Sequence, residues 1–69
     1  MKRVAVVSTD IAEIGYDSNN MTLEVAFHAG SVYQYFNVSA TLHQQFMNAS
    51  SKGKFLNANI KNKYRYAKV

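Results

Sequence analysis

The chain has 69 residues, a formal net charge of +4, and neither cysteine nor proline. A chain of this length holds one small core, so we expect a single domain over residues 1–69, stabilised without disulfides. The hydrophobic content of 48% excludes a disordered tail, and two histidines without any cysteine predict neither a metal site nor a cofactor.

Three β-strands are predicted in the first half of the chain. In the first of them Ala12, Ile14 and Tyr16 share one face, because apolar residues alternate with polar or small ones. Residues 17–20 are turn formers, and Gly30 marks the next turn. The pattern predicts an antiparallel three-stranded meander with strands at about 11–17, 22–28 and 31–36.

The second turn decides which way two tyrosines point. A three-residue loop ending at Gly30 pairs Val25 with Tyr33 and Leu23 with Tyr35, which places both tyrosines on the core side. A two-residue loop would turn both onto the opposite face. We expect the longer loop, because the glycine then lies where the backbone needs a positive φ.

The second half changes to helical periodicity. Leu42 and Phe46 lie on one side of an amphipathic helix predicted at about 40–50. Ser39 is a suitable N-cap, and a capping box that begins at Thr41 is the alternative.

A second, short helix is expected at about 54–61, with Leu56 and Ile60 turned inward. Gly53 ends the first helix or separates the two. From Tyr64 to the end the residues alternate again and predict a short C-terminal strand. The predicted fold class is therefore α+β, with the helices between the meander and this strand.

Charge is divided between the two halves of the sequence. All four acidic residues lie in the first 24 positions, and residues 25–69 contain none. Six of the eight basic residues lie near the C-terminus: Lys52, Lys54, Lys61, Lys63, Arg65 and Lys68. A basic half without carboxylates favours an anionic partner such as a phosphate backbone, and the alternative is a solvated face that keeps a small protein soluble.

Two pairs of tyrosines have the spacing of a stacking surface. Tyr64 and Tyr66 alternate with basic residues, and unpaired bases stack on such rings when they are exposed. Tyr33 and Tyr35 have the same spacing, although the expected register places them in the core.

Gly53 lies between Lys52 and Lys54 at the expected start of the second helix. Free backbone N–H groups there would suit one phosphate, and a plain helix junction is the alternative. The segment is not a nucleotide-binding P-loop, because that motif needs a glycine where this chain has Asn48.

Catalysis and membrane association are not expected. The four acids are spread over three segments, no cysteine can act as a nucleophile, and His28 and His43 are expected at the surface or at the edge of the core. The sequence therefore predicts no catalytic residues. The apolar run near the N-terminus ends at Ser8, which is too short for an export signal or a membrane helix, so we expect a cytoplasmic location.

The order of residues resembles the KTSC domain. The resemblance is carried by Ile14-Gly15-Tyr16-Asp17, Leu23-x-Val25-x-Phe27-x-x-Gly30, Tyr33-x-Tyr35, Ser51-x-Gly53 and Tyr64-x-Tyr66. One departure is Ser39, at a position where the family often has proline. The resemblance implies a small α+β domain found at the C-terminus of some lysyl-tRNA synthetases and in small stand-alone bacterial proteins. Its occurrence together with a tRNA synthetase suggests RNA binding.

Together these features predict a non-enzymatic module that binds RNA or single-stranded nucleic acid through its basic half. The alternative is a protein interaction or accessory module, which could also self-associate weakly through the terminal strand. The uncharged outer face of the first helix, with Thr41, Gln44 and Asn48, would suit such a protein contact.

Overall fold

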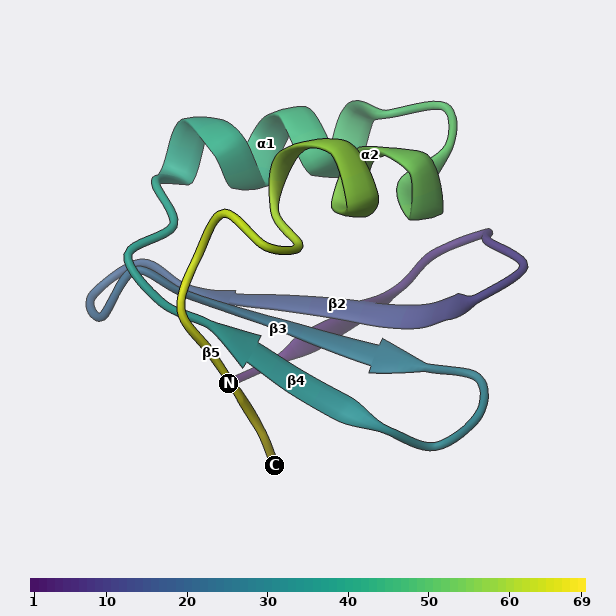
Figure 1. The fold of residues 1–69 in the computed structure, drawn as a ribbon, viewed down its shortest axis with the longest axis horizontal. Helices are drawn as coiled ribbons and strands as arrows, with labels where there is room; N and C mark the ends of the chain where they lie inside the picture. The colour runs from purple at the N-terminus through teal and green to yellow at the C-terminus, as the bar shows by residue number, and fades with distance from the viewer.

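The computed structural model describes residues 1–69 as one antiparallel sheet with two helices packed on the same face (Figure 1). The elements in chain order are β1 (Arg3–Ala5), β2 (Ile11–Asp17), β3 (Thr22–Phe27), β4 (Val32–Tyr35), α1 (Ala40–Asn48), α2 (Lys52–Asn59) and β5 (Tyr66–Lys68). Neighbouring strands in the sheet follow this order, so the helices form an insertion between β4 and β5. The predicted α+β class is confirmed.

The sheet has five strands, where the sequence indicated a meander of three. β1 was not predicted, because all three of its residues are exposed and carry no buried periodicity. The C-terminal strand was expected, and it pairs with β4. It begins at Tyr66, so Tyr64 and Arg65 precede it.

The predicted register of the β3–β4 hairpin is confirmed. Val25 pairs with Tyr33 and Leu23 with Tyr35. The Phe27 N–H donates to the Ser31 carbonyl at 2.9 Å, and Gly30 has a φ of 107°. The loop therefore uses the backbone freedom of glycine where the turn requires it.

A bulge in β2 changes the face expected for its first residues. The register shifts between Ile11 and Glu13, so Ile11 and Ile14 both point toward the helices and are fully buried. Ala12, which was expected on the core face, is only half-buried. The extra residue thus gives the core a second isoleucine.

Both helices are capped by serines. Ser39 accepts a hydrogen bond from the Leu42 N–H at 3.1 Å, which settles the start of α1 in favour of this cap over one at Thr41. Ser51 accepts from the Lys54 N–H at 3.3 Å and begins α2 two residues before the predicted start. Gly53 therefore lies in the first turn of α2. The sequence had suggested that it ends the first helix or separates the two, and this expectation is wrong.

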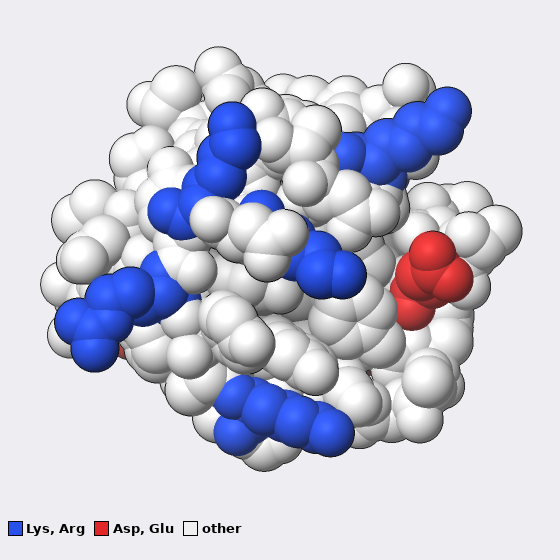
Figure 2. Space-filling model, in the orientation of Figure 1, with Lys and Arg blue, Asp and Glu red and all other residues white.

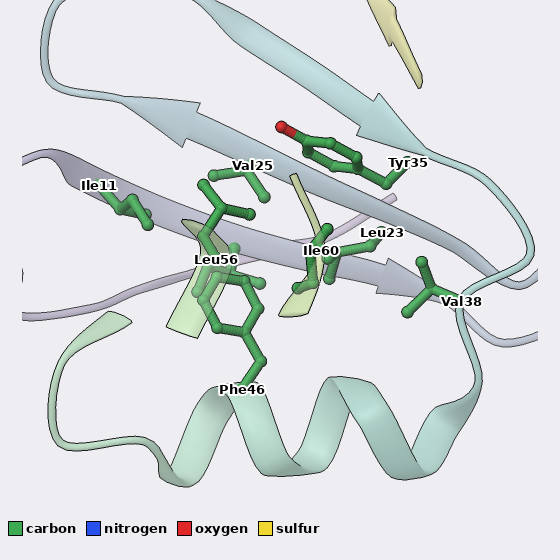
Figure 3. Packing of buried hydrophobic residues seen from close by; sticks show 9 residues of the cluster. Ile11, Leu23, Val25, Tyr35, Val38, Phe46, Leu56 and Ile60 are labelled. Atoms are coloured by element: carbon green, nitrogen blue, oxygen red, sulfur yellow. The ribbon is translucent and has the colours of Figure 1, made fainter. Parts of the chain in front are cut away.

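The core lies between the sheet and the helices (Figure 3). Phe46 of α1 is fully buried and stacks on Phe55 of α2 at 5.4 Å between ring centroids. Leu56 and Ile60 point inward as predicted. The cluster comprises Ile11, Ile14, Leu23, Val25, Tyr35, Val38, Phe46, Leu56 and Ile60.

Candidate nucleic-acid interface

The six predicted basic residues do not all have the same role. Lys52 is half-buried, and its ammonium group donates to the Ala49 carbonyl just beyond α1 at 2.5 Å. It therefore stabilises the carboxyl end of that helix. The other five are exposed and form no ion pair: Lys54, Lys61, Lys63, Arg65 and Lys68.

Two of the four acids share one arginine within the sheet. Arg3 Nε lies 3.4 Å from a Glu13 carboxylate oxygen and 3.5 Å from one of Glu24. Gln34 donates a further hydrogen bond to Glu24 at 2.8 Å. Because Glu24 alternates with the buried Leu23, this network lies on the sheet face opposite the helices.

The third acid, Asp17, shapes the turn between β2 and β3. A hydrogen bond from the Asn20 side chain, at 2.8 Å, lowers the pKa of this carboxyl group. Three of the four acids are thus used within the sheet half of the molecule.

Figure 2 shows how the charges are distributed over one face. Lysine and arginine side chains are spread across it and separated by uncharged surface, with an acidic group near one margin. A single small anion needs converging cations, whereas a chain of phosphates can meet cations that lie apart. This distribution suits an extended polyanion better than one isolated phosphate.

The start of α2 already has an anion beside it. A Cβ added to Gly53 would lie 3.7 Å from Asp10 Oδ2. The same carboxylate borders a polar hollow of about 390 Å³ that is also lined by Lys52 and Lys54. A carboxylate at the positive end of the helix dipole disfavours a second anion there. Gly53 is therefore a poor position for a phosphate, contrary to the expectation from its flanking lysines.

The tyrosines are grouped differently from the prediction. Tyr64 and Tyr66 were expected to share a strand face, but Tyr64 is half-buried against the core and only Tyr66 lies on β5. Tyr66 pairs with Tyr35, and its ring centroid lies 6.0 Å from that of Tyr35 and 5.7 Å from that of Tyr33. The core-side placement of Tyr35 is confirmed, while Tyr33 is half-buried. The position of Tyr66 beside Tyr33 and Tyr35 was not predicted from the sequence, because the pairing of two strands far apart in the chain leaves no local sequence pattern.

Each histidine has a structural contact. His43 stacks on Tyr16 at 4.5 Å between ring centroids, and burial lowers its pKa. The Tyr16 hydroxyl donates to the Val38 carbonyl at 2.5 Å. His28 Nε2 lies 3.0 Å from the Ser8 carbonyl. No group of three or more acidic or histidine side chains is placed to hold a metal ion, and neither helix has the length and apolarity to cross a membrane.

The fold defines a small α+β domain in which a pair of helices is inserted before the last strand of an antiparallel sheet. Residues 7–64 match the family model described as the KTSC domain, and the chain belongs to this family. The crystal structure of a KTSC domain protein from Yersinia pestis superposes with a TM-score of 0.93 at 43% identity, over 99% of this chain and 96% of that one.

Relatives occur in two settings. An uncharacterized protein of Stutzerimonas stutzeri is 37% identical over 70 residues, which cover 100% of this chain and 99% of that protein. A lysine–tRNA ligase of Trichormus variabilis is 41% identical over 59 residues, or 86% of this chain. The chain spans only 10% of the ligase, so it resembles one small part of that protein.

Proposed function

We propose that this chain is a non-enzymatic module that binds RNA or another single-stranded nucleic acid. Its contact surface is formed by Lys54, Lys61, Lys63, Arg65 and Lys68. The observation that carries the proposal is that these five cations are exposed and unpaired, while Arg3 takes up two of the acids on the opposite sheet face. Unpaired surface cations release counterions when phosphates bind, which is the main source of affinity in such complexes.

The relatives support the same function. Lysine–tRNA ligases of Trichormus variabilis, Nostoc punctiforme and a further Nostoc strain contain a stretch similar to this chain, and a tRNA ligase acts on RNA. A similar stretch also makes up nearly the whole of a small protein. The same domain thus occurs within an enzyme that acts on RNA and also by itself. This distribution is expected of a binding module, whereas part of one catalytic centre would not be expected to occur alone.

A protein interaction module is the alternative. Thr41, Gln44 and Asn48 on α1 are exposed and uncharged. Such a face gives no attraction to phosphate and would suit a polar protein contact. Chemical-shift changes confined to α1, or dimerisation that rises with concentration, would favour this alternative.

The direct test is titration of the protein with single-stranded RNA at about 50 mM salt. Substitution of Lys61→Glu and Lys63→Glu removes two cations, and each cation that no longer meets a phosphate should weaken binding roughly eightfold at this salt concentration. Lys2→Glu is the control, because it makes the same kind of substitution once, at an exposed lysine outside the proposed surface, so its effect is compared with the effect per substituted lysine in the double variant. Absence of RNA binding, or equal weakening in the control, would contradict the proposal.

A further inference from the structure

A groove of about 630 Å³ lies between the aromatic side chains of β4 and helix α2. Phe27, Tyr33 and Tyr35 contribute its aromatic wall, and Asn57 of α2 and Lys61, just beyond that helix, line the other side. Phosphate binding by the five exposed cations does not by itself require this groove. The groove is open to solvent and large enough to be considered as a ligand site.

The aromatic wall is fixed by contacts between rings. Phe27 meets Tyr33 edge to face at 5.8 Å, with an interplanar angle of 84°. Tyr33 lies 6.5 Å from Tyr35 at an interplanar angle of 20°. The rings therefore hold one another in place, and Tyr33 is only half-buried, so part of its side chain is accessible from the groove that it lines.

Tyr35 is a buried residue whose hydroxyl group has no hydrogen-bond partner within the chain. Only 4% of the residue is exposed, and its hydroxyl makes no hydrogen bond within the chain, unlike the hydroxyl of Tyr16. No buried side-chain polar atom in the molecule lacks a partner, so the hydroxyl oxygen must open into the groove that the residue lines. Figure 3 shows this oxygen directed away from Val38. A polar atom at the end of a buried ring is a ready partner for a ligand.

The opposite wall supplies further recognition groups. Asn57 of α2 and Lys61, which follows the end of that helix, are both exposed, and neither side chain is engaged in a hydrogen bond or an ion pair. An amide can donate to and accept from the edge of a base, and an ammonium group attracts phosphate. Asp10 also borders the groove. Its charge repels phosphate, so a bound phosphate must lie toward Lys61.

We propose that this groove binds one unpaired nucleotide, with the base against Tyr33, the edge of the base at the Tyr35 hydroxyl and Asn57, and the phosphate at Lys61. The inference rests on the proposed function and makes it more specific. The exposed cations attract the strand, and the groove holds a single base taken out of the stack. Recognition of this kind is usual for single-stranded RNA.

The test uses the full chain, a six-nucleotide single-stranded RNA and free mononucleotides, followed by amide chemical shifts. Tyr35→Phe and Asn57→Ala should each weaken RNA binding about 2- to 10-fold, as expected for loss of one hydrogen bond. Because these groups are neutral, the salt dependence of binding should stay unchanged. Asn48→Ala is the matched control, since Asn48 is exposed on α1 and does not line the groove. The Tyr35 hydroxyl has no partner in the chain, so Tyr35→Phe should fold normally.

The outcomes separate the inference from the function on which it rests. In one outcome RNA binds, the Lys61→Glu and Lys63→Glu variant loses affinity, and Tyr35→Phe and Asn57→Ala bind as the control does. The nucleotide site in the groove is then wrong, and the proposed function stands. If only mononucleotides bind, with shifts confined to the groove, the proposed function fails while the nucleotide site stands. If neither ligand produces shifts, both are wrong.

Discussion

At the scale of single residues, His43 couples the stability of the fold to pH. Its ring is stacked on Tyr16 at the edge of the core, and burial lowers its pKa below the ordinary value of about 6.5. The unfolded chain keeps that ordinary value, so it takes up a proton at a higher pH than the folded protein does. This histidine therefore stabilises the fold fully above pH 6.5, and its contribution is lost as the pH falls toward the folded-state pKa.

We expect the free energy of unfolding to decrease as the pH is lowered from about 7 through the folded-state pKa of His43, by at most about 1.4 kcal/mol per pH unit. Urea denaturation at a series of pH values measures this. In His43→Gln the dependence should disappear from this interval, whereas His28→Gln should retain it because His28 is exposed. A pH dependence that survives in His43→Gln would assign the effect to another group.

At the scale of elements, two glycines differ in how closely neighbouring atoms approach them. A Cβ on Gly15 of β2 would lie 2.8 Å from Arg3 Cγ and 3.0 Å from the Lys2 carbonyl, so any larger residue there would force the Arg3 side chain or β1 to shift. Gly53 in α2 has ordinary space around its Cβ position. Glycine thus permits the close approach of β1 in the strand, while in the helix it only reduces stability.

Gly15→Ala should displace β1, weaken the ion pairs of Arg3 and lower the free energy of unfolding by about 1–3 kcal/mol. Gly53→Ala should instead raise it by about 0.5–1 kcal/mol, because alanine favours the helix. Urea denaturation compares the two, and hydrogen exchange of the β1 amides locates the first effect. A neutral result for Gly15→Ala would show that the close approach of β1 is not required.

The same scale shows what could be predicted from the sequence and why. One glycine placed at a turn was enough to predict the register of β3 and β4, because a three-residue loop puts Gly30 where its φ is positive. β1 could not be predicted, since a three-residue exposed edge strand buries nothing. In the site, the exposure of five cations agrees with the sequence-based expectation, but the capping role of Lys52 depends on where α1 ends.

At the scale of the whole molecule, the division of charge along the sequence becomes a division in space. The net charge of +4 is the sum of two different halves. In the sheet half, three acids form ion pairs or shape a turn, and in the C-terminal half the exposed cations form no ion pair. Asp10 is the exception, because it lies beside the start of α2 and borders the groove. Its carboxylate disfavours a phosphate directly at the start of α2.

The salt dependence of RNA binding tests the central claim most directly. If the five exposed cations all contact phosphates of a single strand, the logarithm of the binding constant should fall with the logarithm of the salt concentration with a slope of about −3.5. The Lys61→Glu and Lys63→Glu variant should have a slope smaller by about 1.4, and Lys2→Glu should keep that of the unaltered protein. Absence of binding at about 50 mM salt, or an unchanged slope in the double variant, would contradict the account.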